Sequence, residues 1–261
     1  MKRIFVLLMC LMLALPTALS ESPKQSGDYT YILAEDGTAV ITGYTGKGRT
    51  LAIPASVDGL AVSAVGEEAF AGSDVTIVNL PEGILSVGDG AFKECASLIS
   101  VIMPEGLQTL GASTFRKCES LRILTLPSTI TEIGKGAFFG CVNLTEIVLP
   151  EALTELPTNM FYGCTMLETV TIPENVTVIG ATAFMNCSAL KEVILPDGVT
   201  EILAGAFSGC DSLGELKVSE NLESIGYGAF TSESFKLIVV KGSYAESYCK
   251  KFHVNYEYAE E

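Results

Sequence analysis

Apolar residues recur at one fixed interval along most of the chain. Proline, phenylalanine and cysteine each return at every twenty-third residue, as in Pro81 and Pro104, Phe92 and Phe115, and Cys95 and Cys118. The three series end at Pro196, Phe230 and Cys210. Polar residues between them change from copy to copy. A period of about 20 to 50 residues is typical of stacked units that cannot bury their apolar sides alone. The pattern therefore predicts a repeat solenoid.

Each coil begins with a short strand. In the coil that starts at Leu190, Val193 and Leu195 point inward while Glu192 and Ile194 alternate outward. The proline that follows has no N–H to offer and ends the strand. The aligned repeat reads L-x-x-I-x-L-P-x-x-V-x-x-I-G-x-x-A-F-x-x-C-x-x, and its position 1 falls at Val75, Leu98, Leu121, Leu144, Leu167, Leu190 and Leu213.

The second half of the coil returns to the start of the next one. Val176 and Ile179 form a second inward row, and Gly180 permits a tight turn that a side chain would obstruct. Phe184 and Cys187 follow at a spacing that fits one helical turn. We expect a right-handed coil with parallel β-strands on the concave face and short helical or irregular turns on the convex face.

The two ends depart from the repeat, as capping units do. Residues 29–50 alternate around Asp36-Gly37 and predict a β-hairpin, and the first coil carries an insertion near Asp58-Gly59. At the other end, a strand over 235–240 slips register. A short helix over 243–251, with Ser243 as its N-cap, and a last strand near 254–258 complete the cap.

The first residues have the features of a secretory signal peptide. Lys2 and Arg3 precede the apolar run 4–15, and Ala18-Leu19-Ser20 offers small residues for cleavage. No later segment is apolar enough to span a membrane. We expect residues 1–20 to be the signal peptide, 21–28 a linker, 29–50 an N-terminal hairpin cap, 51–235 about eight coils and 236–261 a C-terminal cap of strand, helix and strand.

The chain is acidic, with a net charge of −15, and without the signal peptide 14 cations would face 31 acids. A negative field of this size repels nucleic acid and anionic membrane surfaces. It serves solubility, or it attracts a basic partner or calcium. Hydrophobic residues make up 48 % of the chain, which favours an ordered core over disorder.

Cysteines in a secreted chain normally suggest disulfides. Here the six repeat cysteines would have parallel Cβ vectors, which favours buried free thiols that act as small packing residues. No CxxC pair accompanies them, so no metal site is expected. Cys249 stands outside the repeat and is expected to be partly exposed. His253 is the one histidine and is expected to be structural or solvated, not catalytic.

Outward residues of the predicted strands vary from coil to coil. A branched residue suits a strand anywhere, but an apolar ridge edged with acids also fits a protein-binding surface. Paired carboxylates can bind calcium or cleave glycosides, but Glu146 and Glu192 are two coils apart, about 10 Å. The candidate binding residues are Ile102, Arg122, Thr125, Glu146, Val148, Glu168, Thr171, Glu192, Ile194, Glu215 and Lys217.

The repeated segments IPENVTVIGATAFMNC (172–187) and LPSTITEIGKGAFFGC (126–141) resemble the BspA-like class of bacterial leucine-rich repeats. DGTAVITGY and KGSYAESYCKKF resemble the usual ends of that family, so the likeness covers roughly residues 29–258. It implies a secreted or surface-associated, non-enzymatic adhesion or recognition scaffold, a monomer without cofactors, with a protein or glycan ligand. The alternative is a structural spacer or self-associating surface element.

Overall fold

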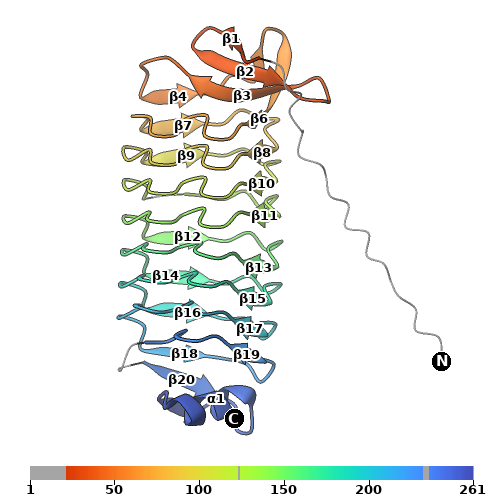
Figure 1. Cartoon of the computed structure of the whole chain (residues 1–261). Coiled ribbons are helices and arrows are strands. Elements are labelled where there is room, and N and C mark those ends of the chain that lie inside the picture. Colours follow the sequence, from red (N-terminus) through yellow and green to blue (C-terminus); the bar gives the residue numbers. More distant parts are fainter. Residues whose placement is uncertain (1–21, 123, 232–234, 261) are drawn as a thin grey trace, which may run out of the picture.

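The computed structural model of the chain describes residues 22–122, 124–231 and 235–260. Its coils are stacked along one axis, with a group of β-strands at the N-terminal end and helix α1 (Tyr244–Phe252) at the C-terminal end (Figure 1). The predicted signal peptide, residues 1–20, lies outside the described residues. The predicted fold class is confirmed: the molecule is a solenoid of parallel coils.

The predicted strand of each coil forms one side of the solenoid. Equivalent residues pair in parallel, so Glu146 lies opposite Thr169 and Thr169 lies opposite Glu192. The coil between β9 and β12 joins this row through a bridge from Thr125 to Val148. The strands of this first row are β4 (Thr50–Ala52), β7 (Ile77–Asn79), β9 (Ser100–Ile102), β12 (Glu146–Val148), β14 (Thr169–Thr171), β16 (Glu192–Ile194), β18 (Glu215–Lys217), β20 (Lys236–Val239) and β21 (Tyr256–Tyr258).

The return path of each coil forms a second row of short parallel strands, which the sequence indicated only as an inward-facing row. Val176 and Ile179 are both fully buried, as predicted. Ile179 pairs in register with Leu156 and Ile202 of the neighbouring coils. The strands are β6 (Leu60–Val65), β8 (Ser86–Val87), β10 (Thr109–Leu110), β11 (Glu132–Ile133), β13 (Glu155–Leu156), β15 (Val178–Ile179), β17 (Glu201–Ile202) and β19 (Ser224–Ile225).

An antiparallel hairpin covers the first coil. Strands β2 (Tyr29–Leu33) and β3 (Ala39–Tyr44) pair around Asp36-Gly37, where the sequence predicts a turn. Strand β3 then pairs in parallel with β6, so the hairpin continues the second row. This arrangement covers the end of the solenoid that no preceding coil protects.

A further strand, β1 (Lys24–Ser26), pairs with β2, so the prediction of a linker over residues 21–28 is wrong at this point. Gly27 has φ of 57° and allows the chain to reverse directly into β2. Ser26 Oγ also donates to Asp58 Oδ1 at 2.7 Å. Asp58 lies at the turn between β5 (Ser56–Val57) and β6, which is the insertion that the sequence indicated.

The C-terminal end continues the stack beyond the eight coils of the repeat. Lys236 pairs with Glu215, where the repeat interval would place Ile238, and this is the register slip that the sequence indicated. Ser243 caps α1 by accepting a hydrogen bond from the Glu246 N–H at 3.3 Å. Cys249 is only 1 % exposed, so the expectation of partial exposure is wrong, because the helix packs this face against the core.

In the turn around each phenylalanine, successive backbone N–H groups donate alternately to the next coil and within the same coil. Those of Thr182, Phe184 and Asn186 donate to carbonyls of the next coil at 2.8–2.9 Å, and the N–H groups between them donate within their own coil. Thr182 and Asn186 have φ of 54° and 63°. The turn is therefore irregular and not helical, because every second N–H faces the neighbouring coil.

The phenylalanine rings form one stacked column inside the solenoid. From Phe70 to Phe230, neighbouring ring centroids are 5.2–5.9 Å apart and the rings are inclined by 5–17°. The column continues to Tyr44 at one end and to Phe235 at the other. Offset-stacked aromatic pairs contribute about 0.5–1.5 kcal/mol each beyond the area they bury, so the column stabilises the contact between every pair of coils.

The cysteine column makes hydrogen bonds that the sequence did not indicate. The Cys187 thiol donates to the Phe161 carbonyl of the preceding coil at 3.1 Å, and the five other repeat cysteines do the same at 3.0–3.2 Å. The Phe161 carbonyl also accepts the N–H of Cys164 in its own coil. All seven described cysteines are free and buried, as predicted for the repeat cysteines. Burial raises the pKa of Cys141 and Cys210 to about 12.

Glycine follows the second strand row because adjacent backbones lie very close together there. A Cβ on Gly180 would lie 2.4 Å from the Leu156 carbonyl oxygen of the preceding coil. Its φ is not in the left-handed region, so the close approach, and not the tight turn that the sequence suggested, is what requires glycine. Gly134 and Gly226 are equally close to the coils before them.

We expect Gly180→Ala to lower the free energy of unfolding by about 1–3 kcal/mol, because the new methyl group must push two coils apart. Gly214→Ala is the matched control, since a Cβ there meets nothing within 4 Å and its φ is allowed. Its effect should lie within about 0.5 kcal/mol. Urea unfolding followed by circular dichroism measures both, and equal losses would show that close stacking is not the constraint.

We expect no reaction of the native protein with Ellman's reagent at pH 8, because buried thiols do not form the reactive thiolate. After unfolding in guanidinium without reductant, the chain from Glu21 onward should react at all seven cysteines. Fewer than seven reactive thiols would reveal a disulfide and contradict the hydrogen-bonded thiol column.

Candidate functional site

The strand face, which we define as the outward side chains at repeat positions 2, 3 and 5 of the first strand row, is the candidate interaction surface. All eleven residues that the sequence singled out are exposed. The most exposed apolar side chains among them are Ile102 at 57 %, Val148 at 80 % and Ile194 at 56 %. Their inward neighbours are buried or, for Met103 and Leu195, partly buried against the core, so the backbone that carries these side chains is held from behind.

Strand pairing brings the central residues into two straight rows. Glu146, Thr169 and Glu192 lie opposite one another at position 3. Val148, Thr171 and Ile194 do so at position 5, and Thr125 joins them through its bridge to Val148. Position 5 therefore alternates between a branched apolar residue and threonine along the solenoid axis.

Charges are neutralised at some of the predicted positions. Glu168 makes an ion pair with Lys191 at 2.8 Å, and Lys236 lies between Glu215 and Glu257 at 3.4 and 2.9 Å. Glu146 and Glu192 make no ion pair within the described residues. The centre of the strand face thus keeps its negative charge, while its C-terminal end is partly neutralised.

A second acidic row borders the strand face, and the sequence reasoning missed it. The residue at repeat position 8, directly after the proline position, is acidic in six of seven coils, with Ser128 as the exception. This signal was present in the repeat, but it lies outside the predicted strand. We call this row the acidic margin: Glu82, Glu105, Glu151, Glu174, Asp197 and Glu220, all exposed and without an ion pair in the described part of the chain.

The turn side carries a different surface feature that the sequence also did not indicate. The Phe139 and Tyr162 rings stack with centroids 4.6 Å apart, and the Arg116 guanidinium lies 4.2 Å from the Phe139 centroid. All three side chains are half-buried. The residue after each core phenylalanine could have revealed the row, because only there do Arg, Phe and Tyr follow one another at the repeat interval.

Three hollows in the surface lie away from the strand face. They have volumes of about 470–570 Å³ and are lined by the loop 44–49, by the turn side near Arg116 and by the second strand row near Gly88 and Gly111. None of these three includes a predicted binding residue. The strand face therefore suits a macromolecular partner better than an enclosed small molecule.

Potential metal ligands and paired carboxylates are the remaining candidates for chemistry. The described residues contain no group of three or more His, Cys, Asp or Glu side chains placed to hold a metal ion. Thr169 separates Glu146 from Glu192, as expected from the sequence, so these carboxylates do not form a close pair. His253 is exposed and ends α1 with φ of 58°. Within the same residues, no helix is long and apolar enough to cross a bilayer.

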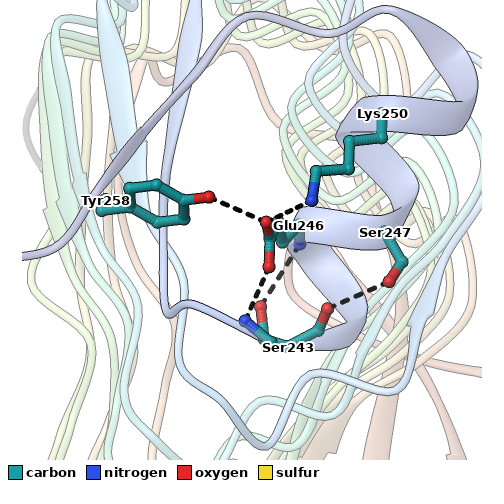
Figure 2. Close-up of polar contacts among 6 residues, drawn as sticks. Ser243, Glu246, Ser247, Lys250 and Tyr258 are labelled. Atoms are coloured by element: carbon teal, nitrogen blue, oxygen red, sulfur yellow. Dashed lines mark hydrogen bonds and ion pairs between the residues drawn. The ribbon is translucent and has the colours of Figure 1, made fainter.

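One buried charge, Glu246 in α1, forms a polar cluster in the C-terminal cap (Figure 2). Its carboxylate accepts hydrogen bonds from the Gly242 N–H at 2.6 Å, from the Tyr258 hydroxyl at 2.8 Å and from Lys250. The hydrogen bond from Lys250, followed by those from Gly242 and Tyr258, lowers the pKa of Glu246 to about 2. Because every partner lies within the cap, we assign the cluster a structural role: it ties α1 to β21.

We expect the C-terminal cap to open at low pH. The pKa of Glu246 is lower in the folded state than its ordinary value of 4.5, so its contribution is complete above pH 4.5 and is lost as the pH falls toward 2. Hydrogen-exchange protection of the amides in α1, corrected for intrinsic rates, measures this. Glu246→Gln should already lower protection at pH 7 and flatten the profile, whereas Glu260→Gln should leave it unchanged. A Glu246→Gln profile like that of the wild type would contradict the assignment.

The parallel strand rows and the buried leucine and phenylalanine columns define the class of protein: a leucine-rich repeat solenoid. The model of the BspA type leucine rich repeat region matches in six copies over residues 63–191 and 154–253. The chain therefore belongs to the BspA type leucine-rich repeat family, as its sequence resemblance implied.

Two solved structures are similar to the whole solenoid. A leucine rich cell surface protein from Faecalibacterium prausnitzii is 26 % identical, with a TM-score of 0.61 over 85 % of this chain and 77 % of that one. The Treponema pallidum leucine rich repeat protein is 28 % identical, with a TM-score of 0.59 over 92 % of this chain and 100 % of that one. Comparison with curated proteins gives no match.

Proposed function

We propose that the protein is a non-enzymatic binding scaffold of the bacterial cell surface or its surroundings, and that it recognises a protein or glycan through the strand face. The observation that carries this proposal is the contrast within each coil. Inward positions are occupied by aliphatic residues packed in the core throughout, whereas the outward ones vary and, among the described residues of the coils that start at Leu121, Leu144, Leu167, Leu190 and Leu213, are all exposed. The likeness to a cell surface protein supports the location, and so does the signal peptide that the sequence predicts.

Binding on such a surface relies on shape and on many weak contacts. Strand β14 is already paired on both sides, with β12 and with β16, so little conformational entropy is lost there when a partner docks. The exposed branched side chains supply apolar area, and the glutamates supply specificity and a faster encounter with the partner.

The test uses the chain from Glu21 onward on an array of extracellular matrix proteins, mucins and cell-surface glycans. Glu146→Lys with Val148→Asp alters the strand face, and Glu155→Lys with Thr154→Asp makes the same charge changes on the second row of the same coil. We expect the first double variant to weaken capture at least tenfold, because it reverses one charge of the strand face and places another in its apolar row. The second should capture as the wild type does.

Circular dichroism and thermal unfolding should show both double variants folded. Retention of a wild-type partner by the strand-face variant, or failure of the wild type to capture any array member, would argue against the proposal.

The alternative, a structural spacer or self-associating surface element, is favoured by one observation. The half-exposed stack of Arg116, Phe139 and Tyr162 on the turn side has the residue types enriched in protein interfaces. If this alternative holds, sedimentation should show that the protein associates as its concentration rises. The double variant Phe139→Ser with Tyr162→Ser should lose that association. The binding proposal instead expects a monomer at all concentrations tested.

A further inference from the structure

The strand face combines an apolar row with acidic rows on both sides. Position 5 carries Ile102, Val148 and Ile194, each more than half exposed, with threonines between them. Position 3 contributes Glu146 and Glu192 on one side. On the other side, three residues further along each chain segment, runs the acidic margin. A partner that covers the apolar row must therefore present positive charge along both of its own edges.

The negative charge of the strand face excludes several classes of binding partner. The acids of the margin, Glu146 and Glu192 make no ion pair within the described residues, so their charge is available to a partner. A second copy of the same face would bring like charges together, which costs several kcal/mol. Nucleic acids and sulfated glycans are repelled for the same reason. The complementary partner is a cationic polypeptide with an apolar stripe.

Spacing distinguishes a helix from an extended strand. Val148 and Ile194 are two coils apart, and parallel strands repeat at about 4.8 Å, so the apolar residues recur at about 9.6 Å along the axis. In an α-helix, residues i and i+7 share one face and lie about 10.5 Å apart. Residues on one face of an extended strand recur at about 6.8 Å, which does not match.

Length is also compatible with a helix. Ile102 and Ile194 are separated by four coils, about 19 Å, which about 13 helical residues span. The exposed side chains Ile102, Val148 and Ile194 provide apolar contact along this length. Helices that dock through an apolar face are a common form of peptide recognition.

We propose that the strand face binds a basic amphipathic α-helix of a partner protein along the solenoid axis, with its apolar stripe on Ile102, Val148 and Ile194 and its cations on the acidic margin and position 3. This inference rests on the proposed function and narrows its ligand to one chemical class. It differs from capture by net charge alone, because it requires the apolar row and one particular face.

The test uses three synthetic peptides, each five helical turns long, and fluorescence anisotropy. The first has leucines on one helical face flanked by lysines, the second is a scramble of the same composition, and the third replaces lysine by glutamate. The first peptide should bind, the scramble should bind at least tenfold more weakly, and the third should not bind. Equal binding of the first peptide and the scramble would overturn the proposal, because no apolar stripe would then be recognised.

Matched charge reversals identify the face. Glu151→Lys with Glu174→Lys alters the acidic margin, and Glu155→Lys with Glu201→Lys makes the same change on the exposed positions of the second row. We expect the first pair to weaken binding of the basic peptide at least tenfold and the second pair less than twofold. Val148→Asp should weaken it at least tenfold as well. Equal effects of the two pairs would overturn the assignment to the strand face.

Failure of this inference can be told from failure of the proposed function. If the basic peptide does not bind, but an array member is captured and is lost on Glu146→Lys with Val148→Asp, the helix is wrong and the binding scaffold stands. If neither the peptide nor any array member binds, both proposals fail.

Discussion

The structure depends on the way each coil divides its backbone hydrogen bonds between itself and its neighbours. In the turn around Phe184, every second N–H donates to the next coil, while the alternate ones close the turn locally. Because the same atoms meet in successive regular coils, the number of residues between them is constant there, and the insertion at Asp58-Gly59 is confined to the first coil. This repeated pairing explains the constant repeat interval, and it places each phenylalanine over the last and each thiol beside a carbonyl of the preceding coil. A single coil would leave these groups without partners.

Much of this arrangement could be predicted because it repeats. The period, the inward residues of both rows, the free thiols and the ends of the solenoid all have local patterns, such as the Ser243 cap or the turn at Asp36-Gly37. What could not be predicted depends on distances between coils. Gly180 appeared to serve a turn, whereas the carbonyl of Leu156 is what excludes a side chain. The strand β1 was missed because its anchor, Asp58, lies in the first coil and far along the chain.

The outward positions of the candidate surface could be predicted from the sequence, whereas the extent of that surface could not. Alternation along each strand indicated which side chains point outward, and the eleven residues are indeed exposed. The acidic margin was visible as a repeated acid after the proline position, but nothing in a single sequence relates it to the strand face until the coils are stacked. The stack of Phe139 on Tyr162 was hidden in the same way, since half-exposed aromatics resemble ordinary repeat variation. Constant inward positions account for folding, so recognition is expected where the coils differ.

We propose that recognition takes place on the strand face and its acidic margin. Carboxyl footprinting of the chain with and without a bound partner, read by mass spectrometry, tests it most directly. With a partner retained from the array, modification of Glu151, Glu174 and Glu192 should fall severalfold, while Glu155 and Glu201 on the second row should be modified as in the free protein. Protection of Glu155 and Glu201, with Glu151, Glu174 and Glu192 unchanged, would show that the partner binds the second row and not the strand face.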